Sequence, residues 1–443
     1  MTPNHVGMII ERLRSTVGRK QLPASRLPLP ALTLIFVAVA LVSCGKEPAA
    51  PAEVPAAAAY TPSAASLERA KLLAQKMLIV DTHVDVPYRL ETEWEDVSQR
   101  TEKGHFDFVR ATEGGLNVPF MSIYVAWRYQ DSALGGAYEQ GNNLIDAVEK
   151  IAGQSPDKFA IAYSTDDVWQ QFANGIISFP MGMENGAPIG TELANLEHFY
   201  DRGIRYITLT HSKVNQISDS SYDLDNRPWD GLSEFGVDVV KEMNRLGIMI
   251  DISHLSDAAA NDTLDATETP VIASHSSARR FTPGWERNIS DEIIERVADN
   301  GGVVQINFGS AFVNPEANLW SQEYFAIWDA FVEENGYYGH EQEVKDFGKA
   351  YKKENPPPPS YLSDVLDHYD HVVELVGIDY VGIGSDYDGV ENVPVGLEDT
   401  STYPNLIAGL LERGYSEEDI EKILGGNLMR VWKAVEDHAT AAE

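Results

Sequence analysis

Residues 79–85, Ile-Val-Asp-Thr-His-Val-Asp, are the stretch around which this chain of 443 residues is organised. The run is apolar and β-branched, and it ends in His-x-Asp just before Pro87. Side chains two apart in a strand point the same way, so His83 and Asp85 would leave one strand end together. One imidazole and one carboxylate presented side by side suit a borderline divalent cation such as zinc.

Apolar runs of this kind recur along the chain and are predicted to be strands. They are 78–85, 117–125, 176–184, 206–211, 248–254, 270–275, 302–308 and 380–386. Amphipathic segments predicted to be helical separate many of them, for example 230–246, 291–299 and 364–376. Runs nearly continuous in Val, Ile and Leu favour a parallel sheet covered on both faces. Eight such units predict an α/β fold, a (β/α)8 TIM barrel, with a doubly wound open sheet as the alternative.

Two stretches exceed a minimal barrel and are predicted to be insertions on its catalytic face. These are residues 88–114, with mixed charges and aromatics, and residues 309–360, rich in Trp, Tyr and Glu. Insertions that follow strands land on the catalytic face, so both are candidate lids or walls. The alternative for each is peripheral packing or a subunit contact. The C-terminal part, 404–434, is expected to form two helices around Gly414.

The N-terminal residues are typical of an export signal. A basic region precedes the apolar run 31–42, which is too short to span a bilayer comfortably. The run ends in Leu-Val-Ser-Cys at 41–44, which resembles the lipobox of bacterial lipoproteins, so residues 1–43 are predicted to be removed and Cys44 to be lipidated. An ordinary signal peptide or short anchor with an incidental cysteine is the alternative.

Residues 44–66 are rich in Ala and Pro and are predicted to tether the lipid to a catalytic domain at 67–443. Gly45 follows the cysteine, so the aspartate that retains lipoproteins in the inner membrane is missing. In a bacterium with two membranes, the resemblance implies the periplasmic face of the outer one. Cys44 is the only cysteine, which excludes an internal disulfide framework. The formal net charge of −34 argues against nucleic acid as a partner.

Metal-binding side chains recur where the predicted strands end. Besides His83 and Asp85, they are Glu184, His211, His254, His275 and Asp386. The strand ends of a barrel converge on one mouth, so these residues would meet in space. Their number exceeds the needs of one metal and suits two that share a bridging carboxylate. Such a pair can hold a hydroxide and polarise a carbonyl.

Competing chemistries lack their motifs. The chain has no Gly-x-Ser-x-Gly nucleophile elbow, no phosphate loop and no cysteine available for catalysis.

With these motifs in order, the chain resembles the membrane dipeptidase (renal dipeptidase) family, the M19 metallopeptidases of the amidohydrolase-like barrels. The likeness covers most of residues 67–436. The motifs that carry it are 81–85, 182–184, 209–211, 251–254, 274–276, 287–291, 384–389 and 396–399.

The resemblance implies a binuclear zinc site. His83 and Asp85 would hold one zinc ion, His254 and His275 the other, and Glu184 would bridge both.

The resemblance also implies roles toward a substrate. His211 would contact the scissile carbonyl and the oxyanion that forms from it. Arg287 would pair with the C-terminal carboxylate of the substrate, which suits a guanidinium fork. Asp386 would move a proton from the bridging water to the leaving amine.

Several assignments have alternatives within the sequence. Asp388 lies in the same turn as Asp386 and could replace it. Arg287 could instead form a surface ion pair or belong to the cap of a helix near Ser290. Asp251 is expected to be structural or to support a ligand. Asn185 stands where many relatives carry Gly and could alter the pocket floor.

The expected function is that of a zinc-dependent, membrane-anchored dipeptidase, with dipeptides that carry a C-terminal D-residue among its candidate substrates. One rival is an amidohydrolase acting on cyclic amides or lactams, although no strand-end lysine is present to act as a carboxylated bridge. The other rival is a lipid-anchored binding protein on a degenerate barrel. The sequence leaves open whether the chain forms a homodimer.

Overall fold

The computed structural model describes residues 60–130, 136–337, 339 and 341–442. The described residues fall into two compact units. Of the described residues, the larger unit contains those up to 321 and those from 358 onward, and the smaller contains those within 322–357. The predicted signal, Cys44 and most of the predicted tether lie outside the described residues.

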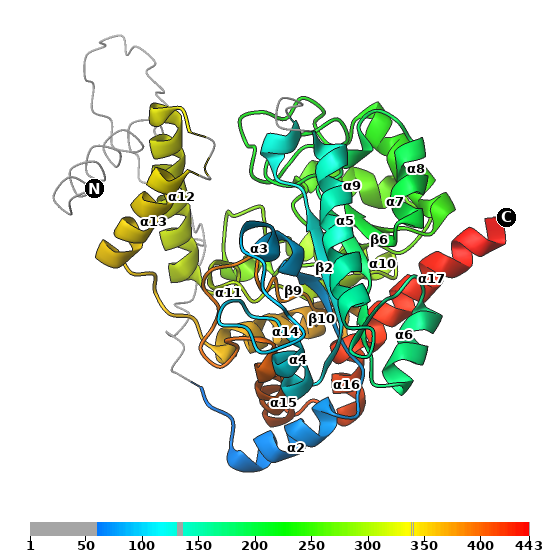
Figure 1. Cartoon of the computed structure of the whole chain (residues 1–443), viewed down its shortest axis with the longest axis vertical. Coiled ribbons are helices and arrows are strands. Elements are labelled where there is room, and N and C mark those ends of the chain that lie inside the picture. Colours follow the sequence, from blue (N-terminus) through cyan, green and yellow to red (C-terminus); the bar gives the residue numbers. More distant parts are fainter. Residues whose placement is uncertain (1–59, 131–135, 338, 340, 443) are drawn as a thin grey trace, which may run out of the picture. The chain divides into compact units, whose positions relative to one another are not determined.

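A parallel sheet of eight strands forms the centre of the larger unit, and helices surround it (Figure 1). The strands, in chain order and in sheet order, are β1 (Ile79–Val84), β2 (Leu116–Tyr124), β5 (Met181–Glu184), β6 (Ile204–Thr208), β7 (Met249–Asp251), β8 (Ile272–Ala273), β9 (Val303–Ile306) and β10 (Val381–Ile383). The first and last strands meet just beyond their carboxyl ends. There the Asp85 N–H donates to the Tyr387 carbonyl (2.8 Å) and the Asp386 N–H to the His83 carbonyl (3.1 Å). The predicted (β/α)8 barrel is confirmed, and the open doubly wound sheet is excluded.

The predicted strand 176–184 is two strands rather than one. β4 (Ile177–Phe179) pairs with β3 (Phe159–Ile161) in a separate two-stranded sheet, and only β5 joins the barrel. Pro180 lies between them, and proline has no N–H to continue a ladder. The residues before Pro180 therefore belong to the small sheet, and those after it belong to the barrel.

Sixteen helices of the described residues accompany these strands. They are α2 (Ala64–Ala74), α3 (Val86–Thr92), α4 (Phe108–Gly114), α5 (Ala137–Gln154), α6 (Thr165–Ala173), α7 (Ala194–Asp201), α8 (Glu234–Leu246), α9 (Asp257–Ala266), α10 (Asp291–Asp299), α11 (Ser310–Val313), α12 (Pro315–Asn335), α13 (Gln342–Glu354), α14 (Leu362–Val376), α15 (Tyr403–Glu412), α16 (Glu417–Glu421) and α17 (Asn427–Ala442). None of the described helices is both long and apolar enough to cross a membrane.

Serine caps explain where the predicted helices begin. α8 begins at 234 rather than 230 because the Ser233 hydroxyl accepts the Gly236 N–H (2.9 Å). α2 begins inside the range assigned to the tether, because Ser63 caps it in the same way. The C-terminal part has three helices rather than the expected two, because α16 lies between α15 and α17.

The amino end of the barrel is filled by side chains of α17. Its Trp432 is fully buried and lies 5.3 Å, between ring centroids, from Phe120 of β2. Gly425, in the π-helical turn Lys422–Gly426 before α17, has no room for a Cβ, which would come within 2.7 Å of Val80. The base of the barrel is therefore packed, and its carboxyl end is left for chemistry.

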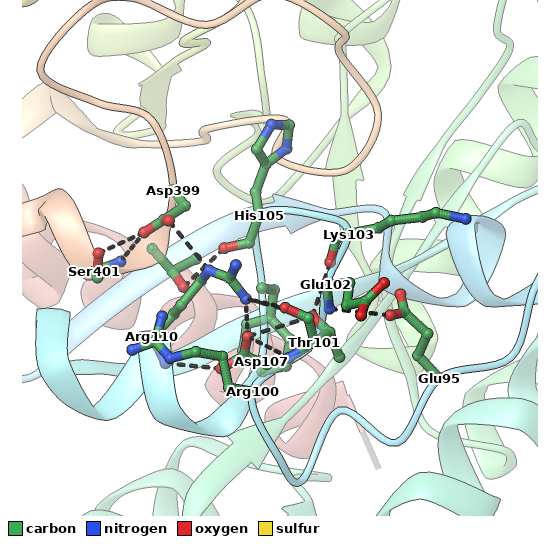
Figure 2. Close-up of polar contacts among 12 residues, drawn as sticks. Glu95, Arg100, Thr101, Glu102, Lys103, His105, Asp107, Arg110, Asp399 and Ser401 are labelled. Carbon is green, nitrogen blue, oxygen red and sulfur yellow. Dashed lines mark hydrogen bonds and ion pairs between the residues drawn. The ribbon is translucent and has the colours of Figure 1, made fainter.

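The insertion at 88–114 is fastened to the segment that follows β10. The Arg110 guanidinium binds Asp399 (3.1 Å), and the Thr400 N–H donates to the His105 carbonyl (3.1 Å). Figure 2 shows Glu95 and Asp107 accepting backbone N–H groups of the turn between them. These bonds make the insertion a fixed part of the larger unit.

The smaller unit has a core of its own. Phe331 of α12 stacks on Phe347 of α13 with 4.1 Å between ring centroids, and Tyr324 and Tyr351 lie 5.3 Å apart. It contains most of the predicted insertion 309–360, whose role as a lid or wall stays a prediction.

Candidate metal centre

The five predicted metal ligands converge at the carboxyl end of the barrel. His83 Nε2 lies 3.3 Å from Asp85 Oδ2 and 3.3 Å from Glu184 Oε2. On the other side, Glu184 Oε1 lies 2.9 Å from His254 Nε2 and 3.3 Å from His275 Nε2. All five side chains are buried, although they come from four different strand ends.

The two oxygens of Glu184 face different imidazoles. Oε2 is directed at His83, whereas Oε1 is directed at His254 and His275, whose Nε2 atoms are themselves 2.9 Å apart. In a tetrahedral zinc site with bonds of about 2.0–2.1 Å, donor atoms are about 3.3–3.4 Å apart. The donor separations of 2.9–3.3 Å therefore fit metal ions, with Glu184 between two donor groups.

His211 and Asp386 lie at the same centre. His211 Nε2 is 3.3 Å from Glu184 Oε1. Possible metal-donor atoms of Asp386, His83 and Asp85 lie within 4.8 Å of one another, and so do those of His211, His254 and Glu184. Both residues that the family resemblance assigns to substrate and proton transfer thus lie beside the candidate metal ligands.

Arg287 is buried beside the second group of imidazoles. Its Nη1 donates to Ser276 Oγ (2.8 Å), and its Nη2 donates to the His275 carbonyl (3.0 Å) and lies 3.0 Å from His254 Nε2. The guanidinium lies over the Phe312 ring at 4.9 Å. Its Nε is buried and has no hydrogen-bond partner among the described residues. Arg287 is therefore not a surface ion pair, and α10 is capped separately by Ser290.

Asp386 and Asp388 have separate surroundings, although both follow β10 in the same turn. Asp386 Oδ2 accepts the Asn307 side-chain N–H (2.7 Å) at the metal centre. Asp388 is bound away from it, by Arg89 Nε (3.0 Å) and by the His105 backbone N–H (2.5 Å). Only Asp386 shares the site with the predicted ligands.

Left-handed backbone conformations redirect the chain around this centre. Five described residues other than glycine have a positive φ, and four of them are Asn185 (86°), His254 (69°), Asp386 (63°) and Asp388 (69°). Such conformations are uncommon outside glycine and gather where the surrounding structure enforces them. Asn185, in place of the family glycine, holds its turn by donating to the Val125 carbonyl (2.8 Å).

Electrostatics in the centre favour a bound cation. Burial would raise the pKa of Glu184, but His83 and His211 hold it well below its usual range. Burial opposes the charge of His83, yet Tyr206, Glu184 and Asp85 raise its pKa well above the ordinary value. The acidic groups that would attract a proton to His83 would equally attract a metal ion.

His254, His275 and Asp386 also have shifted pKa values. Burial lowers the pKa values of His254 and His275 well below the ordinary value, with Arg287 adding to the effect on His254 and His83 and Arg287 adding to that on His275. These shifts favour the neutral imidazole, which is the form that binds a metal. Burial raises the pKa of Asp386 to about 8, against the effect of His83 and with the added effect of Asp85. Asp386 can therefore hold a proton near neutral pH.

Sequence analysis did not single out two residues of the site. Asn307 binds Asp386, and its signal was a polar residue inside the apolar run 302–308. Tyr206 lies beside His83 Nδ1 (2.7 Å), but an aromatic residue in a strand is indistinguishable from core packing by sequence alone. Asp251 supports the site, as predicted, by accepting hydrogen bonds from Ser274.

The sequence matches a known family over nearly all the described chain. The family model for membrane dipeptidases, peptidase family M19, matches residues 67–443. An uncharacterised dipeptidase of Schizosaccharomyces pombe is 33% identical over 389 residues, which cover 83% of each chain. The dipeptidase tcpJ of Claviceps purpurea is 33% identical over 343 residues, which cover 76% of this chain and 71% of the relative.

Solved structures share the fold. The probable dipeptidase PvdM from Pseudomonas aeruginosa superposes with a TM-score of 0.74 at 27% identity, over 85% of this chain and 99% of that one. A metallo peptidase from Rhodobacter sphaeroides, liganded with a phosphinate mimic of the dipeptide L-Ala-D-Ala, superposes with a TM-score of 0.66 at 24% identity. The latter match covers 81% of this chain and 99% of that one.

Proposed function

The chain belongs to the membrane dipeptidase family, peptidase family M19, and from that premise we propose that it hydrolyses the peptide bond of dipeptides at a pair of zinc ions. Its membership makes it a dipeptidase of the metallopeptidase class. The identity and number of the metals, the preferred dipeptide and the attachment to a membrane are the parts that we propose.

One observation carries the proposal of two metals. The two oxygens of a single buried carboxylate, Glu184, face separate imidazoles at 2.9–3.3 Å. His83 and Asp85 would hold one zinc ion, His254 and His275 would hold the other, and Glu184 would join both. Imidazole and carboxylate donors suit zinc. When bound, the zinc pair supplies an activated water and polarises the carbonyl that the water attacks.

The protein's own residues would bind and orient the dipeptide. The buried Nε of Arg287, which has no partner among the described residues, would donate to the C-terminal carboxylate of the substrate. A dipeptide has a free carboxylate directly after the residue that follows the scissile bond, whereas a longer peptide has another peptide bond there. His211, whose Nε2 lies 3.3 Å from Glu184, would donate to the oxygen of the scissile carbonyl.

Asp386 would move the proton between the water and the leaving amine. Burial raises its pKa to about 8 in the metal-free site, and its position beside His83 and Asp85 places the carboxylate where it could pass a proton from the water to the amine. The Asn307 side chain donates to Asp386 Oδ2 at 2.7 Å and so holds the carboxylate beside His83 and Asp85. The peptide C–N bond breaks as the amine nitrogen receives that proton.

We include dipeptides with a C-terminal D-residue among the proposed substrates. The solved relative from Rhodobacter sphaeroides binds a mimic of L-Ala-D-Ala, which supports the idea for this family fold. Arg287 binds a carboxylate whichever configuration precedes it, so the walls of the pocket would set the stereochemical preference.

The test combines metal content with activity. The full chain, solubilised in detergent, is assayed for zinc and for hydrolysis of matched L,L and L,D dipeptides, before and after chelation. We expect about two zinc ions per chain, and activity that is lost on chelation and restored by zinc. If the protein bound two zinc ions but did not hydrolyse dipeptides, the proposed substrate would be wrong. If it bound no metal, metal-dependent catalysis would be wrong and a binding protein would be favoured.

We also propose that a lipid on Cys44 attaches the protein to the periplasmic face of an outer membrane. Its support is the lipobox-like sequence at 41–44. Membrane fractionation of wild type and Cys44→Ser tests the proposal: release of the variant into the soluble fraction is expected, and retention of the variant would contradict it. Whether the chain forms a homodimer is measured on the same detergent-solubilised protein by analytical ultracentrifugation.

A further inference from the structure

Ser274 connects one candidate ligand to a buried carboxylate. His275 Nδ1 lies 2.7 Å from Ser274 Oγ, which lies 2.6 Å from Asp251 Oδ2. Asp251 also accepts the Ser253 and Ser274 backbone N–H groups and the Thr208 hydroxyl. A carboxylate is only an acceptor, so the single hydroxyl proton of Ser274 is directed at Asp251. The serine oxygen must then accept a proton from His275, which places that proton on Nδ1.

The Tyr206 hydroxyl accepts a proton from His83 as Ser274 does from His275. The Tyr206 hydroxyl lies 2.7 Å from His83 Nδ1 and donates its proton to the Thr82 carbonyl (3.0 Å). A carbonyl cannot donate, so the phenolic oxygen is left to accept from His83. His83 therefore also carries a proton on Nδ1. With the proton on Nδ1, the Nε2 atom of each ring faces Glu184 with its lone pair available to a metal ion.

The other two imidazoles lack such a partner. The Nδ1 atoms of His211 and His254 have no hydrogen-bond partner among the described residues. In the proposed site, His83 belongs to one zinc ion and His275 to the other. Each zinc ion would thus have one imidazole whose tautomer is fixed by a hydroxyl group.

Close backbone approaches keep the two hydroxyl groups in place. A Cβ on Gly182 of β5 would lie 1.9 Å from Tyr206 Cζ, so only glycine lets the tyrosine ring cross that strand toward His83. A Cβ on Gly384 would lie 2.0 Å from the Ser274 carbonyl oxygen. That carbonyl also accepts the Thr82 hydroxyl (2.5 Å). Glycines at these points are required by the arrangement and not by their own backbone conformation.

We propose that Tyr206 and the Asp251–Ser274 pair are positioning residues, each of which fixes the tautomer of one metal-binding histidine and thereby sets the affinity of one zinc ion independently of the other. The inference rests on the proposed zinc site. The inference goes beyond that site because it assigns the two hydroxyl groups to different metal ions. Hydrogen bonds to the distal nitrogen of a metal-binding histidine orient the ring and increase its basicity.

The first measurement is zinc affinity by competition with a chelator, on the full chain in detergent. Tyr206→Phe and Ser274→Ala should each weaken one of the two zinc ions by about 10- to 100-fold and leave the other unchanged. Ser274→Thr, which keeps the hydroxyl, should bind zinc like wild type.

Two control variants remove a similar hydroxyl elsewhere. Tyr369→Phe removes a buried phenol that donates to the Gly382 carbonyl (3.0 Å), and Ser218→Ala removes a buried hydroxyl that donates to the Asp219 carbonyl (3.0 Å). Neither hydroxyl touches a histidine ring, so both variants should bind zinc like wild type. A loss of affinity in these controls equal to that in the test variants would show a general packing effect and overturn the inference.

The assignment of each hydroxyl to one metal is tested in a background that retains one zinc ion. In His83→Ala protein, Tyr206→Phe should have no further effect on the remaining zinc ion, whereas Ser274→Ala should still weaken it 10- to 100-fold. Equal effects of both substitutions in this background would overturn the separate assignment.

Nitrogen NMR of zinc-loaded protein with labelled histidine reads the tautomer directly. Tyr206→Phe and Ser274→Ala should each remove or shift one hydrogen-bonded Nδ1–H signal, which the two controls should retain. Persistence of both signals in both test variants would overturn the inference and leave the dipeptidase proposal intact. If the wild-type protein bound no zinc, that result would instead overturn the proposed function itself.

Discussion

Replacing Arg287 by methionine should remove the preference for a substrate with a free C-terminal carboxylate. Arg287 is 1% exposed, and its two terminal nitrogens donate to Ser276 Oγ at 2.8 Å and to the His275 carbonyl at 3.0 Å. A carboxylate about 4 Å from this charge gains about 4 kcal/mol at an effective dielectric constant of about 20. That free energy corresponds to a ratio of about 1,000 in kcat/KM.

The assay compares a dipeptide and its C-terminal amide in wild type and Arg287→Met. The four kcat/KM values form a thermodynamic cycle, so losses common to both substrates cancel. We expect wild type to favour the acid by about 100- to 1,000-fold, and the variant to hydrolyse both substrates at similar, low rates. Zinc content is measured in parallel, because Arg287 Nη2 lies 3.0 Å from His254 Nε2.

Arg279→Met is the matched control from the same segment. Arg279 binds Asp257 through its Nη1 atom (2.6 Å), away from the candidate ligands, so its loss should leave the preference for the acid unchanged. If Arg287→Met lowered hydrolysis of the acid and the amide by the same factor, Arg287 would not bind the substrate carboxylate.

Three further substitutions give distinct results. Gly389→Ala places a Cβ 2.2 Å from Asp85 Oδ2 and 2.5 Å from Asp386 Oδ1, so zinc affinity measured with a chelator should fall at least about tenfold; unchanged affinity would contradict this geometry. Asn185→Gly relieves a positive φ but removes three side-chain hydrogen bonds, so chemical denaturation should show a loss of about 2 kcal/mol while dipeptide turnover persists. His368 has its pKa lowered to about 3 by burial, so its contribution to stability is complete above about pH 6.5 and falls as the pH drops from there toward 3, by about 2 kcal/mol at pH 5. His368→Asn should flatten this dependence in chelated protein, and parallel pH profiles for variant and wild type would refute it.

The strand ends and their polar residues were predictable because the two-residue repeat of a strand and the topology of a barrel determine where they lie. A strand repeats every two residues, so His83 and Asp85 had to share a direction, and a barrel gathers its strand ends at one mouth. The same reasoning placed Glu184, His254 and His275 together without any knowledge of their distances. The register of the sheet agrees, because Glu184 pairs with Thr208, and Thr208 with Asp251, at one level.

The features that sequence analysis missed depend on side chains that cross between strands. Tyr206 reaches His83 over Gly182, and neither the crossing nor the reason for the glycine can be inferred from local pattern. The division of the run 176–184 at Pro180 is a second case, because a proline within an apolar run can end a strand or lie on its edge. A third case is the pair Asp386 and Asp388. Asp388 is bound by Arg89, which is distant in sequence, and this ion pair holds Asp388 away from the site.

The compact unit at 322–357 was also beyond sequence analysis. The insertion was recognised by its length and composition, but its paired aromatic rings were not. Aromatic residues on a surface insertion suggest contacts with the rest of the protein equally well as a small core of their own.

The packing of Trp432 against Phe120 has a consequence for how the protein is made. The contact joins the second strand of the barrel to its last helix, and the bonds between residues 83–85 and 386–387 join positions about 300 residues apart. Contacts over such separations form slowly, because the loop entropy must be lost before they provide any stability. The inner faces of the early strands consequently remain uncovered until the last helix has been synthesised. The barrel can therefore close only after its last strand and last helix are available, and apolar surface exposed before then is prone to aggregation.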